Sequence, residues 1–278
     1  MSFLFGEPIM LKIISLMLGL ALSICSSALA GEKYSFHENL HVGQKVPFTL
    51  VYDTDTKTTT TINGISSTTD SETKYLWKVT LTIQAVKDGS AIRAQADVDP
   101  TSTDTVITGS GASTIPCSYA GKSVIISENP DNSFTNNFTG SARDDDTDLL
   151  NNFITPDEDY YPDQPVAIGD TWDNSAKLSK HSSLGPNDQM LSQCRLDWVK
   201  TIGGKPMAQF SNSYAAVYHE AGHLEEDYEA TCTFLVDVNR QMIVKADQTA
   251  TSTYKTPADS AAQITGGVKN TFHCECGE

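Results

Sequence analysis

Basic residues are scarce in this chain, in which 19 Lys and Arg stand against 35 Asp and Glu, for a formal net charge of −16. A surface with this charge repels phosphate groups, so the composition argues against binding to nucleic acids and against docking on an anionic membrane. An excess of acidic side chains by itself indicates no more than a soluble surface. We therefore look elsewhere in the sequence for signs of a ligand.

Long apolar runs are absent after residue 30, so we expect no membrane-spanning segment in the mature chain. Residues 1–30 have the features of a secretory signal peptide: Lys12, then an apolar stretch, then Ala28-Leu29-Ala30 before Gly31. They predict cleavage after Ala30 and a product that is secreted or periplasmic. Residues 1–9 hold no basic residue, so Met10 is an alternative start. A lipoprotein anchored at Cys25 is disfavoured because Ile24 is large.

The number of cysteines after the signal segment is odd. Removing Cys25 from the six leaves Cys117, Cys194, Cys232, Cys274 and Cys276. Exported proteins meet oxidising conditions, so we expect pairing, with one thiol left over. A disulfide between Cys194 and Cys232, which we place on neighbouring strands, is one expectation, and two buried thiols are the alternative. Cys274 or Cys276 is a candidate partner for Cys117.

Alternation of apolar and polar side chains predicts β-strands with one buried face along most of the mature chain. Asn63-Gly64, Asp88-Gly89 and Gly203-Gly204 separate such segments and are typical of tight hairpin turns. The Thr- and Ser-rich stretch 54–73 predicts a long exposed hairpin, with a disordered tip as the alternative. The clearest alternating segments are residues 46–52, 75–85, 92–98, 194–198 and 228–238.

Residues 160–173 form a joint in the chain, in which Pro162 and Pro165 keep the backbone extended and Gly169-Asp170 turns before the apolar anchor Trp172. The segments before and after it share one order: a polar hairpin, a strand that contains Trp, a Gly turn and a return strand. This order predicts two related halves, residues 31–159 and 160–278, although unrelated antiparallel sheets can share it.

One short helix is expected before this joint. Acidic residues at 144, 146 and 148 precede Leu149, Leu150 and Phe153, and Asp146 or Thr147 is a suitable N-cap. The predicted fold is thus mainly β, with antiparallel curved sheets in an open half-barrel or a sandwich, and one short helix.

The motif with the clearest chemistry is His219-Glu220-Ala221-Gly222-His223. On a helix, His219 and His223 would lie one turn apart as zinc ligands, and Glu220 would activate a bound water. About ten residues here resemble the zinc helix of membrane-anchored, ATP-driven zinc proteases, but the phosphate-binding loop of that family is missing. The third ligand is not evident, with Asp247 or His273 as the only distant candidates.

The neighbours of this motif argue for a different structure. A strand leads in from Ala208 and a strong strand leads out from Tyr228, so a hairpin that turns near Ala221-Gly222 accommodates the whole segment. In that arrangement both histidines lie in an exposed loop and bind no metal. Zinc is therefore expected only in the alternative interpretation.

The sequence also resembles an uncharacterised family of secreted bacterial proteins, the domain of unknown function of type 6263. The resemblance depends on Val86-Lys87-Asp88-Gly89-Ser90-Ala91, on Leu149-Leu150, and on a Pro-x-x-Pro-Val-x-x-Gly-Asp-x-Trp motif at residues 162–172. It implies export and a β-rich fold similar to that of periplasmic lipoprotein carriers. It implies no activity and no catalytic residues.

These observations favour a non-enzymatic envelope or periplasmic protein whose curved sheet holds an apolar small molecule or lipid. The alternative is a zinc-dependent metallohydrolase that uses the motif at residues 219–223. A purely structural surface protein is a third class that the sequence does not separate from the first.

Overall fold

The computed structural model describes residues 31–277, apart from residues 131–132, 139, 144–145, 148–149, 151–158, 181–187, 221–223 and 257–261. The predicted signal peptide, with Cys25, lies outside the described residues. Residues Lys33–Glu278 form one compact unit, which is described below. The predicted division at residue 159 into two related halves stays a prediction.

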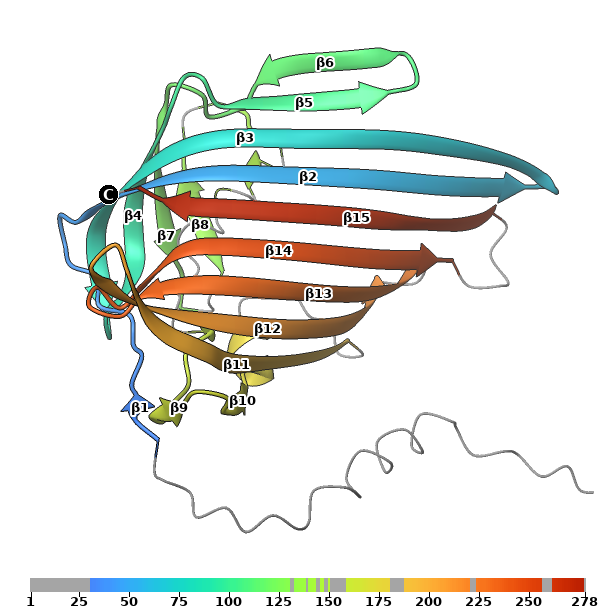
Figure 1. Cartoon of the computed structure of the whole chain (residues 1–278). Helices are drawn as coiled ribbons and strands as arrows, with labels where there is room; N and C mark the ends of the chain where they lie inside the picture. The colour runs from blue at the N-terminus through green and yellow to red at the C-terminus, as the bar shows by residue number, and fades with distance from the viewer. Residues whose placement is uncertain are drawn as a thin grey trace, which may run out of the picture. The chain divides into compact units, whose positions relative to one another are not determined.

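One large antiparallel sheet of 13 strands dominates this unit (Figure 1). Its strand order is β10-β11-β12-β13-β14-β15-β2-β3-β4-β7-β8, and the β5–β6 hairpin branches from β3. Among the described residues no pairing joins the end strands β10 and β8, so the sheet is open. The mainly β, antiparallel fold class is thereby confirmed. The strands are β2 (Lys45–Ile62), β3 (Ile65–Lys87), β4 (Ser90–Val98), β5 (Thr103–Thr108), β6 (Gly111–Pro116), β7 (Ser123–Glu128), β8 (Phe134–Asn137), β10 (Thr171–Asp173), β11 (Gln189–Ile202), β12 (Lys205–Glu220), β13 (Leu224–Asp237), β14 (Met242–Lys255) and β15 (Ala262–Cys276).

The remaining elements are small. Strands β1 (Lys33–Tyr34) and β9 (Val166–Ala167) form a separate two-stranded sheet. Helix α3 (Ser175–Leu178) was not predicted from the sequence. At the predicted helix, Asp146, Thr147 and Leu150 are helical, and Leu149 and Phe153 lie outside the described residues.

The three predicted hairpin turns are confirmed. Asn63 and Gly64, Asp88 and Gly89, and Gly203 and Gly204 all have positive φ, as tight turns between twisted strands require. The first of these turns joins β2 to β3, which pair up to Ile62 and Ile65 at the tip. The stretch 54–73 is therefore the long hairpin that its Thr content predicted.

Two apolar clusters lie on the same face of the sheet, which we call the inner face. The first cluster centres on Trp77 and Leu50, with side chains from β2, β3, β4 and β7. The second centres on Phe210 and Leu196, with side chains from β11, β12 and β13. In both clusters, buried positions alternate with exposed ones along each strand, as the sequence pattern predicted.

The joint at residues 160–173 belongs to the second cluster. Tyr161 is buried, and the Trp172 ring packs edge-on against Phe210 with ring centroids 5.4 Å apart. The Trp172 Nε1 donates to the Tyr160 carbonyl at 3.0 Å. The backbone N–H of Ala167 donates to the Asp170 carboxylate at 2.8 Å, which closes the predicted Gly-Asp turn. This joint thus anchors the end of the sheet that begins with β10.

Residues 36–43 form a strap that connects the two clusters. Phe36 packs in the second cluster and Leu40 packs against the first. The strap is also tied to two hairpin turns: the His37 N–H donates to Gln241 Oε1 at 3.0 Å, and the Leu40 N–H donates to the Gly89 carbonyl at 2.9 Å. It therefore holds the β13–β14 and β3–β4 turns at a fixed separation.

The predicted disulfide between Cys194 and Cys232 is wrong. Strand β12 runs between β11 and β13, so Cys194, Asn212 and Cys232 form one row across three strands. Strands two places apart lie about 10 Å from each other, beyond the reach of a disulfide. All five cysteines are present as thiols, and none is bonded to Cys117. Burial raises the pKa of Cys194 and of Cys232 to about 12.

The strap gives a direct test of what holds the sheet in shape. Gly89 has φ +95°, and a Cβ at this position would lie 2.2 Å from the Glu38 carbonyl oxygen on the strap. At Gly64, φ is +78° and a Cβ would contact nothing within 4 Å. We expect Gly64→Ala to lower the free energy of unfolding by about 1 kcal/mol, from backbone strain alone. We expect Gly89→Ala to lower it by about 3 kcal/mol or more, because the strap must also move. Chemical denaturation measures both values, and equal values would contradict the role of the strap.

Candidate functional site

A cavity of about 660 Å³ lies on the inner face of the sheet, between the two apolar clusters. Strands β2 and β3 border it on one side and β13, β14 and β15 on the other. The strap contributes Glu38 and Leu40 at one end. The volume falls within the range of about 300–1,000 Å³ that is usual for small-molecule sites.

The walls nearest the strap are apolar and aromatic. Phe48, Leu50 and Ala246 line the cavity there, with Val46 and Val244 beside them. The walls are apolar because every second residue of β2, β14 and β15 points to the inner face, and near the strap these residues are apolar.

An aromatic row crosses the middle of the cavity. Tyr52 stacks on Tyr75 with ring centroids 5.6 Å apart, and Phe272 meets Tyr52 at 6.3 Å. Across the cavity, Tyr160 and Phe234 pack at 4.5 Å. Aromatic side chains supply a large apolar contact area at a low cost in conformational entropy.

Beyond the aromatic row the walls become polar but stay uncharged. Thr54, Thr73 and Asn270 line this end, and Gln248 Nε2 donates to the Tyr228 hydroxyl at 2.9 Å. Burial raises the pKa of Tyr228 well above its usual value, so this phenol remains neutral.

Charged groups contribute little to the cavity walls. Lys245 and Asp247 border it through strand β14, but their side chains pair with each other at 3.4 Å, and Asp247 also bonds His273 at 2.6 Å. These residues alternate with Ala246 and Gln248, so they point to the outer face. Glu38 on the strap is the carboxylate at the cavity's edge, and it is buried.

The structure places the first two residues of the predicted zinc motif, His219 and Glu220, on a strand. His219 and Glu220 end β12, and they pair with Glu225 and Leu224 of β13. His223 lies outside the described residues, as do Ala221 and Gly222, where the turn was predicted. A helix that would place two imidazoles on one side is therefore not formed at residues 219–220.

The distant zinc ligands that the sequence suggested are not near His219. Asp247 lies opposite Thr233, which in turn lies opposite Ser211 of β12. Eight residues of strand separate Ser211 from His219, a distance of about 26 Å. Within the part of the chain that the structure describes, no group of three or more His, Cys, Asp or Glu residues is placed to hold a metal ion.

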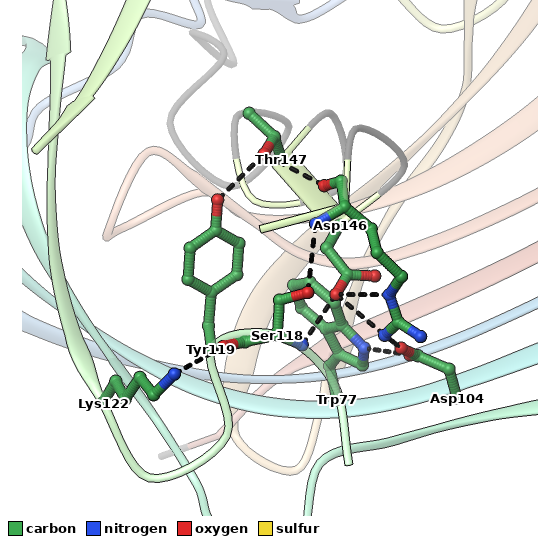
Figure 2. A network of polar contacts seen from close by, with 8 residues as sticks. Trp77, Asp104, Ser118, Tyr119, Lys122, Asp146 and Thr147 are labelled. Atoms are coloured by element: carbon green, nitrogen blue, oxygen red, sulfur yellow. Dashed lines mark hydrogen bonds and ion pairs between the residues drawn. The ribbon is translucent and has the colours of Figure 1, made fainter. Parts of the chain in front are cut away.

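A second polar cluster lies beside the first apolar cluster (Figure 2). Arg143 forms ion pairs with both Asp104 and Asp146, two carboxylates that are almost completely buried. Trp77 Nε1 donates to Asp104 at 2.9 Å, and the Ser118 N–H donates to Asp146 at 2.7 Å. These contacts tie the segment after β6 to the centre of the sheet, so we assign the cluster a structural role.

Sequence reasoning predicted a curved sheet that holds an apolar ligand, but it did not predict which residues line the cavity. A usable signal was present in β2, whose alternate residues from 46 to 62 are apolar and then hydroxyl-bearing, without a charge. The neighbours β14 and β15, which come from the far end of the sequence, complete the wall, and this pairing was not predicted.

The zinc alternative makes a prediction that metal analysis can test. If residues 216–226 form a hairpin and not a zinc helix, purified mature protein contains much less than one zinc per chain. His219→Ala then leaves the metal content and the thermal stability unchanged. One zinc per chain that is lost in His219→Ala would restore the metallohydrolase interpretation.

The polar cluster predicts that replacing the exposed Arg143 strongly lowers the free energy of unfolding. Arg143→Met leaves Asp104 and Asp146 buried without their counter-ion, and we expect the free energy of unfolding to fall by about 3 kcal/mol. Arg195 is exposed and pairs loosely, at 3.7 Å, with the half-buried Asp197, which also accepts from Gln209 and Ser211. Arg195→Met is therefore the matched control, with an expected change of less than about 1 kcal/mol. Urea titration compares the two, and similar losses would contradict the structural role of the cluster.

Comparison with known proteins identifies no family for this chain. No family model and no curated protein matches this chain, so membership of the type 6263 family stays a prediction. Among solved structures, the chain is similar to lipovitellin, from a study of lipid–protein interactions in that protein, with a TM-score of 0.48 and 6% identity over 86% of this chain. This chain spans 25% of the lipovitellin chain.

Two bacterial structures show weaker likeness. The COG4313 outer membrane channel from Pseudomonas putida F1 has a TM-score of 0.25 and 12% identity, over 86% of this chain and 97% of the channel. A DUF1329 family protein from Desulfovibrio piger ATCC 29098 has a TM-score of 0.14 and 7% identity, over 82% of this chain and 84% of that one. Among the described residues, no helix has the length and apolar character needed to cross a bilayer. Likenesses of this degree carry no information about function.

Proposed function

We propose that this chain is an exported envelope protein that holds an apolar small molecule or lipid in the cavity between β2 and β14. The observation that carries the proposal is a cavity of about 660 Å³ whose walls near the strap are aliphatic and aromatic. An apolar ligand that leaves water for such walls gains about 25 cal/mol per Å² of buried surface. Several hundred Å² therefore offset the cost of immobilising the ligand.

The three buried thiols, Cys117, Cys194 and Cys232, are compatible with export. Cysteines in an oxidising compartment react as thiolates, and a raised pKa suppresses that form. Burial raises the pKa of Cys117 to about 11, and the pKa values of Cys194 and Cys232 are higher still. Unpaired but inert thiols can therefore persist outside the cytoplasm. The predicted signal segment at residues 1–30 supports the same location.

Filling the cavity tests the proposal. Ala246 lies on the cavity wall between Leu50 and Phe234, and it is only partly buried. In Ala246→Trp the indole occupies ligand space, so we expect at least a tenfold loss of affinity for the uncharged fluorescent probe 1-N-phenylnaphthylamine. Titration of the probe fluorescence measures this affinity, and mass spectrometry of organic extracts shows whether lipid that purifies with the wild type is lost.

The matched control is Thr251→Trp, which places the same side chain on an exposed position of the same strand, on the opposite face. This variant should bind the probe with wild-type affinity. If the wild type binds no probe and carries no lipid, or if both variants bind as the wild type does, the cavity is not a ligand site. The chain would then be better described as a structural surface protein.

A further inference from the structure

The inner face of four adjacent strands carries no charged side chain. The strands lie in the order β14-β15-β2-β3, and their register places residues 246–254, 264–276, 46–62 and 65–83 in matched rows. Every second residue of these segments points inward, and none of the inward positions is Asp, Glu, Lys, Arg or His. The charges of the same strands, such as Asp53, Lys74 and Lys269, all occupy the outward positions.

The uncharged face changes character along the strands. Near the strap its rows are apolar, as in Phe48 and Leu50, whereas from residue 54 to residue 60 every inward position of β2 is Thr. The facing strand β3 carries Ser or Thr at each inward position from 67 to 73. The cavity spans the boundary, because both Leu50 and Thr56 line it. An occupant that fits both ends has an apolar part at the strap and a neutral, hydrogen-bonding part toward the β2–β3 tip.

Asn270 supplies an acceptor at this boundary. It lies between Ala250 and Thr54 in its row and lines the cavity. Its Oδ1 is buried, and no donor from the described part of the chain reaches it. A buried acceptor without a donor costs free energy that a ligand hydroxyl or N–H would recover.

An anionic head group finds no partner here. The basic side chains of the four strands point outward, and the cavity's edge holds the carboxylate of Glu38. The chain's net charge of −16 adds a repulsive field. A carboxylate or phosphate brought to this face would lose its hydration without gaining a counter-ion.

We propose that the ligand is a neutral amphiphile with one alkyl or acyl chain and an uncharged head that bears hydroxyl or amide groups. Monoacylglycerols, fatty alcohols and glycosylated lipids share this chemistry. Fatty-acid anions and phospholipids do not. The proposal rests on the proposed function, because it specifies the occupant of the same cavity: the chain lies against Phe48 and Leu50, and the head donates to Asn270.

Two ligands with the same acyl chain test the proposal. In full-length mature protein, 1-monooleoylglycerol and oleate are compared as competitors of 1-N-phenylnaphthylamine at alkaline pH, where oleate is ionised. We expect monooleoylglycerol to displace the probe at a concentration at least tenfold lower than the concentration of oleate that does so. If oleate displaces it equally well or better, the neutral-head proposal is overturned, while the apolar-ligand function stands. If the probe does not bind the wild type, the proposed function itself fails.

Two inner-face variants locate the head group. Asn270→Leu removes the acceptor. We expect this variant to bind monooleoylglycerol with about five- to tenfold lower affinity and to bind the probe with unchanged affinity. Thr54→Lys adds a cation to the inner face and should shift the binding preference from monooleoylglycerol toward oleate. Thr49→Lys, on the outer face of the same strand, is the control and should leave this preference unchanged. An unchanged preference in a folded Thr54→Lys protein, together with wild-type binding in Asn270→Leu, would overturn the placement of the head.

Discussion

Strict alternation of charged and uncharged side chains is the constraint on which the rest of this structure depends. In an antiparallel sheet, a shift by one residue would move every charge of a strand to the inner face. Here each of β14, β15, β2 and β3 keeps its charges outward along the length that borders the cavity. The resulting wall is uncharged although the chain as a whole is strongly acidic. The cost of burying a charge without a partner explains why the register is fixed so firmly.

The strap turns this wall into one side of a cavity. A sheet of this size with free end strands needs a contact that sets the distance between its two apolar clusters. Phe36 and Leu40 provide it by packing in the two clusters. The backbone N–H groups of His37 and Leu40 add hydrogen bonds to Gln241 Oε1 and to the Gly89 carbonyl. The ion pairs of Arg143 act in a similar way on the other branch of the sheet, because they hold the segment after β6 against Trp77. Of these two features, only the strap reaches the cavity, through Glu38 and Leu40.

Much of the fold could be predicted from the sequence because its signals are local. The Gly-containing turns at residues 63–64, 88–89 and 203–204 and the two-residue period on either side are enough to predict the hairpins. The pairing of β15 with β2 could not be predicted, because it joins segments about 200 residues apart and depends on the whole sheet. The disulfide prediction failed for the same reason: Cys194 and Cys232 share an apolar pattern, but β12 lies between them.

The site was harder to predict than the fold. The five-residue motif at 219–223 has the spacing of a zinc helix, yet its first two residues continue a strand, because the neighbouring segments 207–218 and 226–237 pair along their whole length. Tertiary pairing here overrides a short local motif. The uncharged wall of the cavity has no such motif. Its signal is the absence of charge at every second position, which becomes meaningful only when four strands are placed side by side.

A crystal structure of the mature protein with a monoacylglycerol brominated on its acyl chain would test the central claim most directly. The anomalous signal of bromine marks the chain, and the glycerol head is visible in the density. The account predicts bromine beside Phe48 and Leu50 on the inner face, with the glycerol within hydrogen-bonding distance of Asn270. Bromine on the outer face, or a chain that lies among the threonines with its head at the strap, would contradict it.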